Sequence, residues 1–130
     1  MRVAFATKDG VSINEHFGWA GEFAVFDINE NDFSLVERRV VAHSNPENDP
    51  DNEPEEIDKI NVRIEAIKDC AIVYCNNIGA VSAARVIRSR IHPIKTTQPV
   101  AIATEIHRLQ EVLKNPPIWI KKIQLRGPVT

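Results

Sequence analysis

The chain has 130 residues, of which 43% are hydrophobic and 26% are charged, so residues 1–130 can bury a core as a single domain. No apolar stretch is long enough to cross a bilayer, and strand-like sequence begins at Arg2, so we expect no membrane span and no secretory signal. Cys70 and Cys75 lie about 16 Å apart on one predicted strand, too far to form a disulfide. Free thiols favour a cytoplasmic location.

The net charge of −2 hides an acidic segment, because six carboxylates fall within residues 44–56. The rest of the chain has sixteen basic and twelve acidic residues. This small positive excess tolerates an anionic ligand but does not indicate nucleic-acid binding. Residues 44–54 also hold three prolines and three asparagines, so we predict an exposed, mobile linker. Its carboxylates lack the spacing and the glycine of a calcium-binding loop.

The first third of the chain predicts three strands. Residues 2–7 read as a strand, followed by a turn and by a loop over residues 11–21. Residues 22–28 and 33–42 are rich in aromatic and β-branched side chains. The short polar link between these two strands predicts an antiparallel hairpin.

Helices and strands then alternate. A helix is predicted from Glu55, and residues 70–75 form a short apolar strand typical of a sheet covered on both faces. A second helix follows Gly79, with Ala80, Ala83, Ala84, Ile87 and Ile91 expected on its buried side. Residues 92–95 predict an edge strand. The isoleucines expected on the buried stripe of the first helix are Ile57, Ile60, Ile64 and Ile67.

Thr97 is a candidate cap for a third helix, with Pro99 in its first turn. The residues of its predicted buried stripe are Ile102, Ile106, Leu109 and Leu113. Residues 116–130 form a C-terminal tail that contains a short amphipathic segment at 118–123. The whole pattern predicts an α/β fold with a five-stranded mixed sheet, in the order 3-2-1-4-5 along the chain, and helices on its faces. This arrangement resembles the ribonuclease-H-like architecture.

Two loops carry the candidate site, residues 14–18 after the first strand and residues 74–80 after the fourth. If those strands are parallel neighbours, both loops leave the same edge of the sheet, where open α/β sheets bind ligands. His16 and Cys75 would then face one crevice. A helix start beside Cys75 would lower its pKa, although a free cysteine is often simply a small buried residue. A loop histidine is likewise often only solvated.

A Cys/His pair supplies too few ligands for a zinc site or an ordinary iron–sulfur site. A preassembled cluster that brings its own sulfides needs only one or two protein ligands and donors for its negative charge. Asn76, Asn77 and the N–H groups near Gly79 are candidate donors, with Lys8 or Arg85 as further ones. A thiol enzyme and a cluster-free protein-interaction module remain alternatives. Nuclease chemistry lacks the carboxylates that two metal ions require.

Several segments together resemble the NifX/NifY family, which binds the nitrogenase iron–molybdenum cofactor (FeMo-co) and its precursors. The resemblance covers nearly the whole chain, and its last segments look most like NifX. The matching segments are residues 3–10, 14–18, 23–27, 69–75, 78–80, 92–95, 118–120 and 126–128.

The resemblance implies a ribonuclease-H-like fold, no enzymatic turnover and a carrier role in nitrogenase cofactor biosynthesis. The cargo would be an iron–sulfur cluster of the NifB-co or FeMo-co type, bound transiently, with His16 and Cys75 as metal ligands. A NifB-type donor and a NifEN-type scaffold would be partners, with no nucleic acid or membrane, and the chain would be a monomer or weak homodimer. Some relatives carry a second cysteine where this chain has Ile78. A homologue serving the vanadium system is the alternative.

Overall fold

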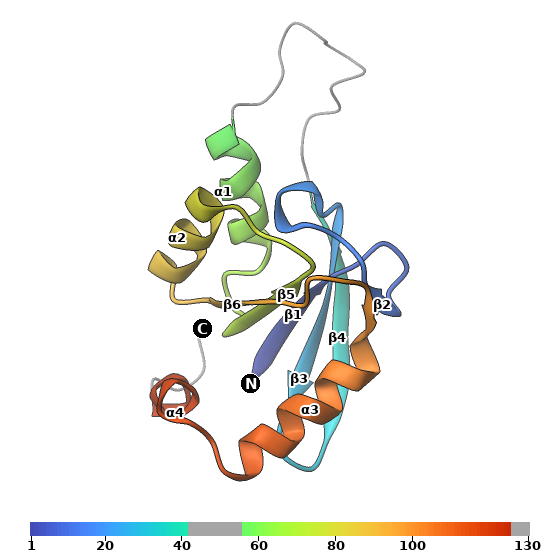
Figure 1. Cartoon of the computed structure of the whole chain (residues 1–130), viewed down its shortest axis with the longest axis vertical. Coiled ribbons are helices and arrows are strands. Elements are labelled where there is room, and N and C mark those ends of the chain that lie inside the picture. The colour runs from blue at the N-terminus through green and yellow to red at the C-terminus, as the bar shows by residue number, and fades with distance from the viewer. Residues whose placement is uncertain (42–55, 126–130) are drawn as a thin grey trace, which may run out of the picture.

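The structure is a computed structural model that describes residues 1–41 and 56–125. The predicted linker at 44–54, Glu55 and the matching segment at 126–128 lie outside these residues, as do the side chains of Glu56 and Ile57. The elements are β1 (Arg2–Ala6), β2 (Ser12–Ile13), the 3₁₀ helix η1 (Phe17–Trp19), β3 (Glu22–Ile28), β4 (Phe33–Val40), α1 (Glu56–Ala66), β5 (Ile72–Cys75), α2 (Ala80–Arg88), β6 (His92–Lys95), β7 (Val100–Ala101), α3 (Ile102–Lys114) and α4 (Ile118–Leu125) (Figure 1).

A mixed sheet of five strands runs in the order β4-β3-β1-β5-β6. β3 pairs antiparallel with both β1 and β4, so the hairpin lies on one side of β1. β5 pairs parallel with β1 and with β6, which places the carboxyl ends of β1 and β5 at the same edge. The predicted α/β class with a mixed five-stranded sheet is therefore confirmed.

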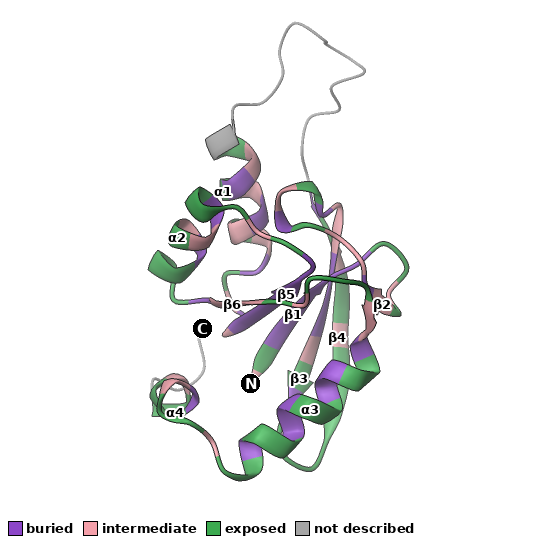
Figure 2. Cartoon of the chain, viewed as in Figure 1, coloured by how far each residue is buried: buried purple, intermediate pink, exposed green. Residues whose placement is uncertain are grey.

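The sheet is covered on both faces, because successive side chains of each strand point to opposite sides. On β5, Val73 and Cys75 join the core cluster that α1 and α2 cover. Ile72 and Tyr74 join the cluster beneath α3 and α4. Figure 1 shows α1 and α2 on one side of the sheet and α3 on the other, and Figure 2 shows the central strands largely buried.

Helix stripes predicted from apolar spacing agree with the structure in α1 and α3. All four predicted residues of the α3 stripe are buried. Ile60 of α1 and Ile67, which directly follows the helix, are buried too, while Ile64 is half-buried. Arg63 is buried as well, and its Nε donates to the carbonyl of Ala20, 3.0 Å away. This guanidinium links α1 to the segment that follows η1.

Three local predictions are wrong. Thr97 does not cap α3, because it has a positive φ of 64° and the helix begins five residues later at Ile102, after Ala101 as its N-cap. Residues 11–21 are not all loop, since β2 pairs with β7 in a two-stranded sheet and η1 follows. The buried side of α2 is formed by Ser82 and Val86 instead of the predicted alanines and Ile87.

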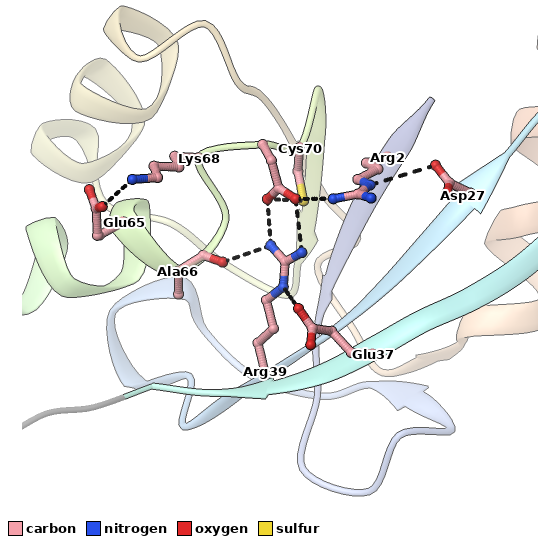
Figure 3. Close-up of polar contacts among 9 residues, drawn as sticks. Arg2, Asp27, Glu37, Arg39, Glu65, Ala66, Lys68 and Cys70 are labelled. Atoms are coloured by element: carbon pink, nitrogen blue, oxygen red, sulfur yellow. Dashed lines mark hydrogen bonds and ion pairs between the residues drawn. The ribbon is translucent and has the colours of Figure 1, made fainter. Parts of the chain in front are cut away.

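A network of charged side chains ties strands together at the end of the sheet where β1 and β5 begin. Asp69, in the turn before β5, accepts hydrogen bonds from Arg39 of β4 and from Arg2 of β1 at 2.5 Å (Figure 3). Arg39 also donates to the carbonyl of Ala66 at 3.0 Å and pairs with Glu37 at 2.6 Å. The two guanidinium groups hold the pKa of Asp69 far below its usual range.

Candidate cofactor-binding site

The two predicted loops meet at the carboxyl edge of the sheet. The N–H of Phe17 donates to the carbonyl of Asn77 at 2.8 Å, and the N–H of Asn76 donates to the carbonyl of Glu15 at 2.9 Å. His16 and Asn77 form a parallel β-bridge between these bonds. The backbone thus holds the His16 loop against the segment that leads from β5 into α2.

The imidazole of His16 lies at the surface of this junction. His16 is exposed and precedes η1, whereas the next residue, Phe17, is fully buried and anchors the loop in the core. Trp19 is 71% exposed, and the ammonium of Lys59 lies 5.0 Å from the centre of its ring. Lys8 pairs with the carboxylate of Glu15 at 4.0 Å. The surface around His16 therefore offers an imidazole and an exposed aromatic ring.

The start of α2 follows shortly after Asn77, the bridge partner of His16, and supplies hydrogen-bond donors. Gly79 is the N-cap and carries no side-chain cap, and no acidic residue stands in the first turn. A helix start without a cap leaves backbone N–H groups and a partial positive charge available for an anion. Gly79 is exposed, and a Cβ at this position would meet no heavy atom within 4 Å, so a ligand can approach the backbone.

Cys75 does not face the crevice, which corrects the predicted accessible thiolate. Its exposed fraction is 0%, and it packs in the core cluster beneath Phe17. Its Sγ lies 4.0 Å from the carbonyl of Ile94. Burial raises the pKa of the thiol to about 11, although the backbone N–H of Phe17 and the charge of Lys95 act in the opposite direction. The helix start at Gly79 lies too far along the chain to offset the desolvation of this sulfur.

Asn76 is also buried, and its side-chain amide is hydrogen-bonded within the fold. It is 8% exposed, and its Nδ2 lies within hydrogen-bond distance of the carbonyls of Ile13 and Gln98 and the hydroxyl of Thr96, at 2.8–3.0 Å. These contacts join the site to β2 and to the segment before β7. Nothing in the sequence distinguishes this buried amide from its exposed neighbour, Asn77.

Asn77 and Arg85 lie at the surface side of the site region. Asn77 is exposed, and its side-chain oxygen accepts from the N–H of Ile78 at 3.0 Å. Arg85 is half-buried and lies 3.5 Å from the side-chain oxygen of Asn61. Of the predicted site residues, the structure therefore brings His16, Asn77 and Gly79 together at the surface.

Cys70, His92 and His107 have structural surroundings. Cys70 is buried, and burial raises its pKa to about 12. His92 stacks on Trp119 at 4.0 Å, and His107 meets Phe33 edge-on at 5.9 Å. Within residues 1–41 and 56–125, no three His, Cys, Asp or Glu side chains gather as a metal-ion site.

Comparison with known proteins identifies the family. The profile of the family described as dinitrogenase iron-molybdenum cofactor matches residues 1–112. The chain belongs to this family. It is 43% identical to Protein NifX of Herbaspirillum seropedicae over 128 residues, which cover 98% of this chain and 84% of that protein. Membership makes it a cofactor-binding protein and not an enzyme.

Two further similarities extend this result. Over 94 residues, the chain is 34% identical to the FeMo cofactor biosynthesis protein NifB of Frankia alni, covering 72% of this chain but 18% of that protein. The crystal structure of PH0822 has a TM-score of 0.64 and 22% identity, covering 85% of this chain and 91% of that one, which supports the fold. No helix in the described part of the chain has the length and apolarity to span a membrane.

Proposed function

We propose that this chain binds a FeMo-co-related iron–sulfur cluster and passes it on during nitrogenase cofactor biosynthesis, without catalysing a reaction. The observation that carries this proposal is the pairing of residues 15–17 with residues 76–77, which holds the loop of the exposed His16 against the segment that enters α2 at its open start. Family membership and the similarity to NifX and NifB support the choice of cargo.

The chemistry of the surface suits an anionic, preassembled cluster. His16 supplies one nitrogen ligand to a metal atom, and the N–H groups at the start of α2 face the negative charge of the sulfides. Residues 70–104, which contain the second loop and α2, include four basic residues and no Asp or Glu. Asn77 can add a side-chain donor at the rim.

A carrier must also release its cargo, and the proposed site is consistent with that. One imidazole and a few backbone donors hold a cluster far less firmly than a closed set of thiolates would. With Cys75 buried under Phe17, the sulfur is not part of the ligand set that we propose.

A NifB-type protein would deliver the cluster and a NifEN-type scaffold would receive it. The ribonuclease-H-like label and the cytoplasmic location stay predictions.

The decisive experiment compares two histidine variants. Purified protein is titrated anaerobically with isolated cluster, and bound iron is measured per chain. We expect His16→Ala to weaken cluster binding at least about tenfold, the cost of losing one metal ligand or its support. His107→Ala is the matched control, because His107 is exposed on α3, and it should bind like the wild type.

Two results would contradict the proposal. One is equal cluster affinity in the wild type and in His16→Ala. The other is the absence of bound iron in the wild type, which would favour a cluster-free interaction module. Cluster uptake of the same stoichiometry from a vanadium-system donor would instead extend the proposal to that system.

A further inference from the structure

Helix α2 carries an apolar stripe on its solvent side. At 100° per residue, the exposed positions of this helix fall on one continuous arc. Val81 is 61% exposed and Ile87 is 60% exposed. The members of the arc are Ala80, Val81, Ala84, Ile87 and Arg88. Four of the five are apolar, so the arc is as wide as the stripe that an amphipathic helix normally buries.

The opposite side of α2 is the one that meets the core. Ser82 and Val86 are buried there, whereas Ala83 and Arg85 at the two flanks are half-buried. The sequence pattern predicts the alanines and Ile87 as the core side, but the structure turns most of this apolar surface outward. Figure 2 shows the resulting exposed strip along α2.

The charges on α2 and on the turn after it have one sign. Arg85, Arg88 and Arg90 follow one another along α2 and the turn after it, and Arg88 and Arg90 are exposed. No Asp or Glu occurs in residues 70–104 to balance them. A surface that combines an apolar ridge with guanidinium groups complements an acidic protein surface with an apolar groove, since arginine pairs with carboxylates in a bidentate manner.

We infer that the exposed stripe of α2 is the docking surface for the protein that exchanges the cluster, through an acidic patch around an apolar groove. The stripe begins at Ala80, directly after Gly79 of the candidate site, so a partner seated on it reaches the cluster. This inference rests on the proposed function. A nucleic acid would use the basic charge but not the apolar stripe, whereas an anionic membrane would use both, and vesicles are therefore included in the test.

The test measures protein association separately from cluster binding. Cluster-free NifB-type and NifEN-type proteins are immobilised, and binding of the whole chain is measured by interferometry. The double variant Val81→Gln/Ile87→Gln removes the apolar contact while keeping good helix formers and the charge. We expect its affinity for at least one of the two proteins to fall about tenfold or more, as for central contacts of an interface.

Arg88→Gln should weaken the same association and reduce its dependence on salt. The matched control is Ile118→Gln/Leu125→Gln on α4. The two wild-type side chains are 72% and 86% exposed, and α4 lies over the other core cluster. Its association should be that of the wild type. Circular dichroism and thermal melting show whether each variant folds.

The result that overturns the inference is unchanged association of the folded Val81→Gln/Ile87→Gln protein with both partners. Failure of the wild type to bind either partner overturns it too, as does binding only to phosphatidylserine vesicles or duplex DNA. Uptake of isolated cluster is measured in parallel and should be normal in this variant. Normal association without any cluster uptake would contradict the proposed function and leave the docking surface standing.

Discussion

At the scale of single residues, burial determines the chemistry of Cys75. The ring of Phe17 is fully buried in the same cluster as the thiol, and the N–H of Phe17 donates to the carbonyl of Asn77. Cys75 ends a continuous apolar strand, so the sequence alone does not say whether its side chain points inward or toward the loops. Period-two alternation from buried Val73 places it inward.

Neither thiol should therefore react in the folded protein. Burial raises the pKa of Cys75 to about 11 and that of Cys70 to about 12, so both remain protonated at pH 8. At this pH, iodoacetamide should modify neither cysteine within the time that labels a solvent-exposed thiol. It should modify both after unfolding in guanidinium. Mass spectrometry of the intact protein measures the labelling. Rapid modification of native Cys75 would show that the sulfur is accessible.

Cys75→Ala isolates the role of the sulfur in the core. Removing a buried Sγ should lower the free energy of unfolding by about 1–2 kcal/mol, measured by urea denaturation. The folded variant should take up cluster like the wild type, because the site that we propose does not use this thiol. Loss of cluster binding in a folded Cys75→Ala protein would return the sulfur to the ligand set.

At the scale of elements, side chains from several segments lock the sheet at both ends. Asp69 joins β1 and β4 to the turn before β5 at one end, and Asn76 joins β2 and the segment before β7 to the site at the other. The sequence pattern locates β1, β3, β4 and α3 because their apolar periods are long. It misses β2 and β7, since two-residue strands have no period, and it misses Asn76, whose partners are distant along the chain.

Asp69→Asn tests the first of these links. At pH 7, it should cost about 1–3 kcal/mol of unfolding free energy, because two arginines lose a charged acceptor. The folded pKa of Asp69 lies below its unfolded value near 4, so its stabilisation is present above pH 4 and is lost as the pH falls. The difference between wild type and variant should therefore shrink from pH 5 to pH 2.5 in denaturant titrations.

Glu65→Gln is the matched control for this experiment. Its carboxylate pairs with Lys68 at 2.5 Å, but the side chains are 70% and 68% exposed (Figure 3). An exposed pair of this kind should contribute less than about 0.5 kcal/mol. Equal losses in Asp69→Asn and Glu65→Gln would mean that the network around Arg39 adds nothing beyond ordinary surface pairing.

Asn76→Ala tests the second link. The carbonyls of Ile13 and Gln98 would lose a buried donor, which should cost about 1–3 kcal/mol. Amide hydrogen exchange should accelerate in residues 12–17 and 98–101 more than in α3. Asn77→Ala is the control, since Asn77 is exposed, and its exchange pattern should resemble that of the wild type. Uniform acceleration in both variants would contradict a local role for Asn76.

At the scale of the whole molecule, the core consists of two clusters on opposite faces of the sheet, and only one of them lies next to the candidate site. The cluster under α1 and α2 lies next to the His16 loop, whereas the cluster under α3 and α4 is on the other face of the sheet. Apolar spacing predicts the α3 stripe because the helix is long and regularly amphipathic. It fails in α2, where Ala and Ile residues form an outward surface, since hydrophobicity alone does not say which side meets the core.

Leu109→Ala should therefore destabilise the protein without changing its site. Leu109 is 3% exposed in the cluster under α3, and its truncation should cost about 2–4 kcal/mol. Cluster affinity, measured well below the lowered melting temperature, should stay that of the wild type. A parallel loss of cluster affinity would indicate that the α3 side contributes to the site.

The most direct test of cluster binding through His16 is a measurement of the nitrogen hyperfine coupling of the bound cluster. The chain is loaded anaerobically, the cluster is reduced to a paramagnetic state, and ¹⁵N-histidine labelling identifies imidazole coupling in pulsed electron paramagnetic resonance spectra. We predict a coupled imidazole in the wild type and in His107→Ala that disappears in His16→Ala. A bound cluster without imidazole coupling, or with coupling that survives in His16→Ala, would contradict it.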